Sequence, residues 1–425
     1  MGNLFIAVLI AGSNSGGAGD WLGWRGPTGM GHTNARDLPL TWGGKTADHV
    51  LWKAPLFDDF DRIRRDHNQS SPIVSGQHVV VTASYWPAGT SAKAYPEHHV
   101  LCFRAGDGKR LWDTRVQPGP WLLSDLRGGY TAPTPASDGQ RIYVVFGSAV
   151  LAALDFQGNL LWRKEIVPHA FDVAMGVSPV LYGDTVLLLC DQLRPEKASV
   201  LLAFDKKTGE RRWARQRPTD DWTHGTPVIA RINGKAQLLA AAAYALQGLN
   251  PETGEVHWWC GLGGGKRTGD TASPVYGSGL VYCDSGRGGP GIAVDPTGSG
   301  DVSKTHLRWK IPQVPEGFSS PLIVGPYLYR THGPETLKCH ELATGKVVYS
   351  ERLVGLSPRV SPVATADGRI YFASAGKSFV VKAGPTFTLL GTSDLGDASD
   401  SSPAVAGDCL YLRGSRYLYC IGYRR

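Results

Sequence analysis

The polar residues just before a recurring Ser-Pro or Thr-Pro dipeptide are the best placed to do chemistry. They bring carboxylate, imidazole, guanidinium and amide groups together, a mixture that could bind a metal ion, a small polar ligand or a peptide. A hydrated polar rim that binds nothing specific is the alternative. The predicted ligand-binding residues are Asn68, Gln69, Asp172, Asp221, His224, Arg267, Asp270, Arg359 and Asp400.

Four aromatic residues lie in long segments between apolar runs and could anchor a protein partner. Large aromatic side chains are enriched at the energetic centres of protein interfaces. Packing within the core or the rim is the alternative for each of them. The predicted partner-binding residues are Tyr85, Trp86, Trp121 and Trp222.

Other motifs that would carry catalysis or metal binding are incomplete. Residues 261–268 (GLGGGKRT) resemble a phosphate-binding loop, but Arg267 stands where Ser or Thr is required. No C-x-x-C, G-x-S-x-G or H-E-x-x-H occurs. The seven cysteines include no adjacent pair and lie mostly in apolar runs, which predicts buried small hydrophobes. The sequence therefore predicts no metal site and no catalytic residue.

The dipeptide that follows these polar residues marks an internal repeat. Each copy is followed by an apolar run, a Gly-containing turn and a second apolar run, and most are followed by a further pair of runs. Four short strands per unit of about 40–50 residues are typical of a β-propeller blade. The eight copies are Ser71-Pro72, Thr134-Pro135, Ser178-Pro179, Thr226-Pro227, Ser273-Pro274, Ser320-Pro321, Ser361-Pro362 and Ser402-Pro403.

The fourth strand of each unit is predicted to carry an aromatic residue that fills the wedge between blades. The last unit has room for only three strands, whereas residues 50–54 read as an outermost strand with no unit before it. We expect this strand to close the last blade and remove an open sheet edge. The predicted structural aromatics are Trp52, Trp112, Trp162, Trp213, Trp258, Trp309 and Tyr349.

Composition agrees with an all-β fold. With 54 Gly, 28 Pro and 19% charged residues, the chain does not resemble a helical bundle, and 42% hydrophobic residues exclude disorder. The net charge of +7 is scattered, which argues against a nucleic-acid partner. We predict an eight-bladed β-propeller of four-stranded antiparallel blades over residues 50–425. Residues 20–49 are predicted to form an N-terminal extension.

Residues 1–19 are predicted to be a signal peptide. Residues 4–11 (LFIAVLIA) form an apolar run that is too short to span a bilayer, and a small polar stretch follows it. The run lacks a preceding basic residue, and no cysteine follows it for lipid attachment. A periplasmic or secreted monomer with no transmembrane segment is the expectation.

Two repeats carry a family resemblance. Residues 202–213 (LAFDKKTGERRW) and 248–258 (GLNPETGEVHW) resemble the repeat of pyrroloquinoline-quinone (PQQ)-type propellers. In size the chain is similar to BamB-type propellers, which implies a protein-binding scaffold in cell-envelope assembly. Enzymes of the wider family are quinoprotein dehydrogenases, and the resemblance implies that they hold PQQ with Ca²⁺ in the central funnel. Their alcohol-oxidising forms use a disulfide between adjacent cysteines, which this sequence lacks.

We therefore expect a non-catalytic propeller that binds a protein or envelope partner and needs no cofactor. A PQQ-dependent oxidoreductase and a ligand or metal sensor are the alternatives. The binding face should be the one that gathers the long irregular segments, because such loops on a rigid scaffold commonly carry function. These segments are residues 57–69, 85–98, 113–130, 164–176, 215–224, 260–271 and 285–290.

Overall fold

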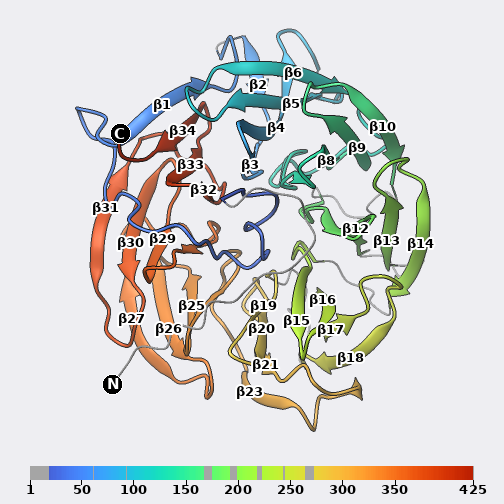
Figure 1. The fold of residues 1–425 in the computed structure, drawn as a ribbon, viewed down its shortest axis with the longest axis vertical. Helices are drawn as coiled ribbons and strands as arrows, with labels where there is room; N and C mark the ends of the chain where they lie inside the picture. The colour runs from blue at the N-terminus through green and yellow to red at the C-terminus, as the bar shows by residue number, and fades with distance from the viewer. Residues whose placement is uncertain are drawn as a thin grey trace.

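Eight antiparallel sheets are arranged as blades around a common axis (Figure 1). The computed structural model describes residues 19–60, 62–91, 93–166, 175–191, 199–217, 223–242, 245–263 and 272–424. Within these ranges the regular elements are all strands, and no helix is long and apolar enough to cross a membrane. The predicted all-β, eight-bladed propeller is confirmed.

Each blade contains four successive strands from the axis outward, and blades 1 and 4 add a short extra strand. Blade 1 comprises β3–β6 (Ile73–Ser75, His78–Pro87, Glu97–Arg104, Arg110–Val116) with β2 (Ile63–Arg65), and blade 2 comprises β7–β10 (Ala136–Ser137, Arg141–Phe146, Val150–Asp155, Leu160–Glu165). Blade 3 comprises β11–β14 (Val180–Tyr182, Thr185–Cys190, Ser199–Asp205, Arg211–Arg217), and blade 4 comprises β15–β18 (Val228–Ile232, Lys235–Ala242, Ala245–Leu249, Val256–Gly261) with β22 (Gly300–Asp301). Blades 5 to 8 comprise β19–β21 and β23 (Val275–Gly277, Leu280–Asp284, Gly291–Val294, Leu307–Ile311), β24–β27 (Leu322–Val324, Tyr327–His332, Thr336–Glu341, Val347–Arg352), β28–β31 (Val363–Ala364, Arg369–Phe372, Lys377–Lys382, Leu389–Asp394), and β32–β34 (Ala404–Ala406, Cys409–Arg413, Tyr417–Ile421) with β1 (Val50–Pro55).

The last blade takes its outermost strand from the N-terminal part of the chain. Strand β1 pairs antiparallel with β34, with Trp52 opposite Cys420 and Ala54 opposite Leu418. Figure 1 shows blue β1 beside dark-red β34. The predicted closure is confirmed, and it joins two distant parts of the chain in one sheet.

The repeated Ser-Pro and Thr-Pro dipeptides form a ring of hydrogen bonds around the axis. The backbone N–H of the Ser or Thr in one blade donates to the hydroxyl of its counterpart in the next, as from Ser71 to Thr134 at 3.0 Å. The following proline has no N–H to satisfy. Seven such bonds occur in the described part of the chain, and we call these eight residues the hydroxyl ring. The other six links are Thr134 to Ser178, Ser178 to Thr226, Thr226 to Ser273, Ser320 to Ser361, Ser361 to Ser402 and Ser402 to Ser71.

The outer aromatic residues fill the wedges between blades. The Trp162 indole donates to Lys206 O at 3.1 Å and covers Gly209, where an added Cβ would lie 2.6 Å from the ring. Gly209 has φ of +69°, so the tight turn and the close approach of the ring both require glycine. The same ring-on-glycine contact recurs for Trp52, Trp112, Trp213 and Trp309 on Gly108, Gly158, Gly254 and Gly345.

Three blades depart from this pattern. In blade 6 the predicted aromatic Tyr349 meets Phe387 of blade 7 edge to face, with ring centroids 5.7 Å apart. Trp258 has the same register but packs on Gly248 of its own blade and donates to Gln237 Oε1 at 2.8 Å. In blade 7 the aromatic position, opposite Val380, is occupied by Gly391. There the residues before β1 supply the ring, because Trp42 stacks on Tyr371 with centroids 6.5 Å apart.

Residues 19–38, which we call the axial segment, cross the inner strands of the ring, as the dark-blue trace in Figure 1 shows. Leu22 O accepts from Ser137 N in blade 2, and Thr33 N donates to Ala364 O in blade 7. Trp24 reaches the hydroxyl ring, where its indole donates to Ser273 Oγ at 3.1 Å. The axial segment therefore occupies the axis down to the hydroxyl ring.

Candidate functional site

The two ends of the propeller differ in what they expose. One end, the turn face, carries the hairpin turns after the first and third strands of each blade, and the axial segment enters there beside turns such as Gly76. The other end, the loop face, carries the connections after the second strands and between blades. Because the axial segment occupies the axis from the turn face, a ligand would reach the hydroxyl ring from the loop face.

Asn68 and Gln69, two of the predicted rim residues, are engaged within the protein. Asn68 is buried, and its amide bonds to both the N–H and the carbonyl of Ser84, at 2.7 and 3.0 Å, and accepts from Thr131 Oγ1 at 2.9 Å. Gln69 donates to Arg127 O at 3.2 Å. These contacts fix the segment before β3, so a structural role accounts for Asn68.

The other predicted rim residues divide into three described residues and four that are not described. Arg359 and Asp400 form a partly exposed ion pair at 3.2 Å, which joins the entries to blades 7 and 8. His224 is half-buried against Gly176. Asp172, Asp221, Arg267 and Asp270 lie outside the described residues, so the predicted ring of ligands stays a prediction.

The predicted aromatic anchors occupy different environments. Trp86 is buried, and its indole donates to Ala94 O at 2.8 Å, so packing accounts for this side chain. Tyr85 is half-buried between His99 and Phe57, with ring centroids 4.8 and 5.5 Å away. Trp121 is half-buried, and Trp222 lies outside the described residues.

Trp86 and Trp121 meet in a small separate core on the loop face. Buried Trp86, Leu123 and Tyr130 form this cluster, and half-buried Trp121 and Leu126 pack on it. We call the segments that build it, residues 86–91, 93–96 and 117–131, the loop platform. It joins the loop within blade 1 to the connection from blade 1 to blade 2.

Hydrogen bonds stabilise the loop platform internally and hold it to blade 2. The Tyr130 hydroxyl accepts from Leu123 N at 2.9 Å, and Ser148 Oγ accepts from Gly119 N at 3.0 Å. Ser148 also contacts the ring of His98 at 2.9 Å. Burial lowers the pKa of His98 to about 3, so this imidazole stays neutral and acts as a structural partner.

The loop platform presents apolar side chains that sequence reasoning missed. Tyr95 is 36% exposed and Leu122 is 43% exposed, although both belong to segments with a buried core of their own. Their positions follow from how two loops fold against each other, and no repeat or motif signals that contact. A rigid support beneath exposed apolar groups is typical of protein-binding surfaces.

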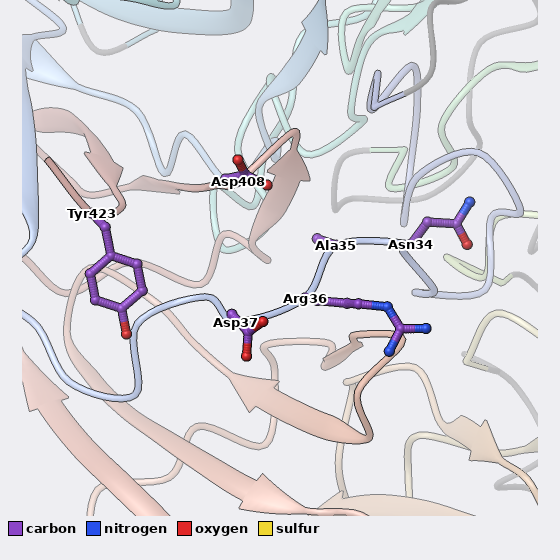
Figure 2. A pocket seen from close by; sticks show the side chains of 6 residues that line it. All are labelled: Asn34, Ala35, Arg36, Asp37, Asp408 and Tyr423. Carbon is purple, nitrogen blue, oxygen red and sulfur yellow. The ribbon is translucent and has the colours of Figure 1, made fainter. Parts of the chain in front are cut away.

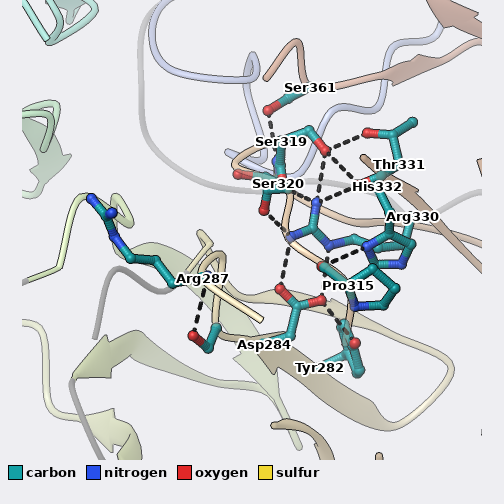
Figure 3. A network of polar contacts seen from close by, with 12 residues as sticks. Tyr282, Asp284, Arg287, Pro315, Ser319, Ser320, Arg330, Thr331, His332 and Ser361 are labelled. Atoms are coloured by element: carbon teal, nitrogen blue, oxygen red, sulfur yellow. Dashed lines mark hydrogen bonds and ion pairs between the residues drawn. The ribbon is translucent and has the colours of Figure 1, made fainter. Parts of the chain in front are cut away.

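A buried ion pair joins Asp284, the last residue of β20, to Arg330 of β25 (Figure 3). Arg330 contacts both carboxylate oxygens of Asp284, at 2.8 and 2.9 Å, and neither side chain is exposed. The guanidinium also donates to Gly317 O, to Thr331 O and to Ser319, while Tyr282 donates to Asp284. Burial alone would lower the pKa of Arg330, but Asp284 raises it above its ordinary value. These contacts make the pair a structural bridge between blades 5 and 6.

Two further buried charges lie between the last blade and the first. Arg413 donates to Ser70 O at 3.0 Å, and burial lowers its pKa to about 9. Asp66 accepts from Tyr130 N, and burial raises its pKa to about 6. This arrangement ties β33 and the segment before β3 to the loop platform, because Tyr130 belongs to that platform.

The described residues do not fit a Ca²⁺-bound quinone. Asp284, a buried carboxylate near the axis, is engaged by Arg330 and Tyr282. No group of three His, Cys, Asp or Glu side chains that could hold a metal ion occurs in the described ranges. The seven cysteines are free thiols, none adjacent to another in the sequence.

A depression of about 440 Å³ lies on the turn face between the N-terminal residues and blade 8 (Figure 2). Residues 34–37 line one side, and Asp408 and Tyr423 line the other. Arg36, Asp37 and Tyr423 are exposed, and Asp37 is paired with Arg369 at 3.2 Å. Sequence reasoning did not predict this depression, and it gathers no buried reactive group.

Comparison with known proteins identifies the family. A family model described as outer membrane protein assembly factor BamB matches residues 96–351, more than half of the chain. The chain belongs to this family. The predicted resemblance to PQQ-type and BamB-type propellers is thereby confirmed. No curated protein sequence matches the chain.

Solved structures similar to this BamB-family chain include a BamB protein and two dehydrogenases. BamB from Moraxella catarrhalis has a TM-score of 0.57 and 13% identity, covering 85% of this chain and 98% of that one. A europium-containing methanol dehydrogenase has a TM-score of 0.66 and 12% identity, covering 95% of this chain and 89% of that one. The quinohemoprotein alcohol dehydrogenase from Comamonas testosteroni has a TM-score of 0.64 and 13% identity, covering 97% of this chain and 82% of that one. At these identities the likeness extends to the fold alone.

Proposed function

We propose that the protein is a non-catalytic scaffold of the cell envelope, exported to the periplasm or secreted, that binds a protein partner through the loop platform. The observation that carries this proposal is the small core of Trp86, Leu123 and Tyr130, built by the same segments that carry exposed Tyr95 and Leu122. A surface that is ordered before binding loses less conformational entropy when a partner docks. Membership of a family described as an outer-membrane assembly factor supports the same role.

The arrangement of charge near the axis favours binding over catalysis. Catalytic acids and bases need a group that is free to exchange a proton with a substrate. Asp284 is instead bound on both oxygens by Arg330, and His98 is held neutral within the packing. The proposed function therefore needs no cofactor.

The test changes the exposed apolar side chains and leaves the supporting core intact. We expect Tyr95→Asp with Leu122→Asp to reduce capture of an envelope partner about tenfold or more, because the charges oppose burial of this surface. The matched control is Val347→Asp with Leu389→Asp, on the exposed outer strands of blades 6 and 7. Equal partner capture by the two double variants would show that the loop platform is not the binding surface.

A parallel assay addresses the oxidoreductase alternative. Protein incubated with PQQ and Ca²⁺ is expected to show no absorbance from bound quinone and no dye reduction with alcohols or sugars. Bound quinone together with substrate-dependent dye reduction would contradict the scaffold proposal and support a PQQ-dependent oxidoreductase.

A further inference from the structure

Three arginines beside the loop platform carry charge that no carboxylate of the described residues neutralises. They are Arg64, Arg65 and Arg416, and all three are exposed. Most other exposed arginines are paired, as Arg104 is with Asp107 at 2.9 Å. Unpaired guanidinium groups gathered at one place favour an acidic ligand.

Aromatic rings and a hydroxyl hold these arginines in place. The Arg64 guanidinium lies 3.9 Å from the centre of a Trp86 ring. Those of Arg65 and Arg416 lie 5.7 and 5.8 Å from Phe60, and Arg65 also donates to Ser415 Oγ at 3.3 Å. A stacked arginine keeps its N–H groups for a carboxylate and loses less freedom on binding.

Two of these arginines belong to a strand with one open edge. Strand β2 (Ile63–Arg65) pairs with the end of β4, with Arg64 opposite Trp86, and has no other neighbour in the described residues. Asp66 N, just beyond the strand, donates to Ser84 O at 3.1 Å. Backbone hydrogen-bonding groups alternate in direction along an antiparallel strand, so the N–H and C=O of Arg64, like the N–H of Asp66, face β4. The N–H and C=O of Ile63 and Arg65 therefore point outward.

We propose that β2 accepts an extended acidic segment of a partner protein as an added strand, an inference that rests on the proposed scaffold function. Outward N–H and C=O groups would pair with the backbone of that segment, while Arg64, Arg65 and Arg416 bind its carboxylates. The open backbone edge favours a peptide over lipid or nucleic acid, which cannot extend a β-ladder. Arg64 of β2 stacks on Trp86 of the loop platform, so the two surfaces adjoin and would serve one partner.

Because Arg64 and Arg65 project from opposite faces of β2, the probe carries acidic residues on both faces. The test measures fluorescence anisotropy with a labelled short peptide in which pairs of consecutive Glu or Asp residues are separated by Val or Thr. Two matched probes are the same peptide N-methylated at every residue, so that neither edge can add to a sheet, and a peptide with Lys at every acidic position. We expect the acidic peptide to bind about tenfold more tightly than either. Equal binding of the N-methylated peptide would overturn strand addition.

Variants then locate the binding site. Arg64→Ala, Arg65→Ala and Arg416→Ala together should weaken peptide binding about tenfold. The control triple variant Arg104→Ala, Arg308→Ala and Arg352→Ala removes the same charge elsewhere and should leave binding within about twofold. Equal effects of the two sets would overturn the assignment to β2.

Two further probes distinguish ligand classes. Duplex DNA or vesicles of anionic phospholipid that bind as tightly as the peptide, with the same dependence on the three arginines, would overturn the peptide assignment. If the protein does not bind the acidic peptide but still captures its partner through Tyr95 and Leu122, the β2 site alone is overturned. If the protein binds the peptide but captures no partner through Tyr95 and Leu122, the proposed function is overturned instead.

Discussion

Five of the outer tryptophans join their own blade to the next by covering one glycine of that next blade. Trp162 is 9% exposed, and its ring covers Gly209. We expect Trp162→Ala to lower the free energy of unfolding by ~3–5 kcal/mol, because it leaves a cavity between blades. Trp259→Ala, at a site that is 39% exposed, should cost less than ~1 kcal/mol. Urea unfolding curves measure both, and similar losses would contradict the wedge role.

Buried Asp66 should make stability depend on pH in a stated direction. Its folded pKa of about 6 lies above the ordinary value of 3.8, so the folded protein holds this proton more tightly than the unfolded chain. The contribution of Asp66 therefore falls as pH rises from about 4 to about 6 and stays low above that range. Relative to Asp66→Asn, the wild type should lose ~2–3 kcal/mol of unfolding free energy between pH 4 and pH 7. A difference that does not change across this range would contradict the buried environment.

Single residues were predictable where the repeat determined them. The positions of Trp52, Trp112 and Trp309 follow from the repeat spacing, and the structure places them in the predicted wedges. Asn68 was predicted as a ligand-binding residue on its polarity, but its partners Ser84 and Thr131 come from β4 and the loop platform. Such partners are fixed by folding in three dimensions, which a local pattern does not record.

At the scale of elements, the residues before β1 are part of the ring. Trp42 takes the place of the aromatic residue that blade 7 lacks, and an added Cβ on Gly391 would lie 2.1 Å from Leu40 O. Gly391→Trp should therefore destabilise the full chain. In a chain that lacks residues 20–42 the same change should restore part of the lost stability. Thermal unfolding of the four proteins tests this reversal, and destabilisation in both backgrounds would contradict it.

Strands and turns of the blades were readable from the sequence, whereas additions to them were not. Alternating apolar runs with Gly-containing turns predict the hairpins of each blade. The axial segment has no such period, because it meets a different inner strand every few residues. Strands β2 and β22 contain three and two residues, too few for any pattern.

At the scale of the whole molecule, closure of the ring determines which surface is free for binding. The hydroxyl ring ties the inner strands, and β1 closes blade 8. The axial segment occupies the axis from the turn face to the hydroxyl ring. The number of blades was predictable because eight dipeptides mark them. The long segments 85–98 and 113–130 were predicted to lie on one face, but the core that joins them was not, because these loops share no repeat position.

The most direct test of the scaffold function places a photoreactive amino acid at Leu122 of the loop platform, at Val347 of the outer strands, and at Tyr423 of the turn face. All three positions are exposed. In cells, we predict one cross-linked partner from Leu122, lost in the presence of Tyr95→Asp, and no product from Val347 or Tyr423. A partner captured from Val347 or Tyr423 and not from Leu122 would contradict the account.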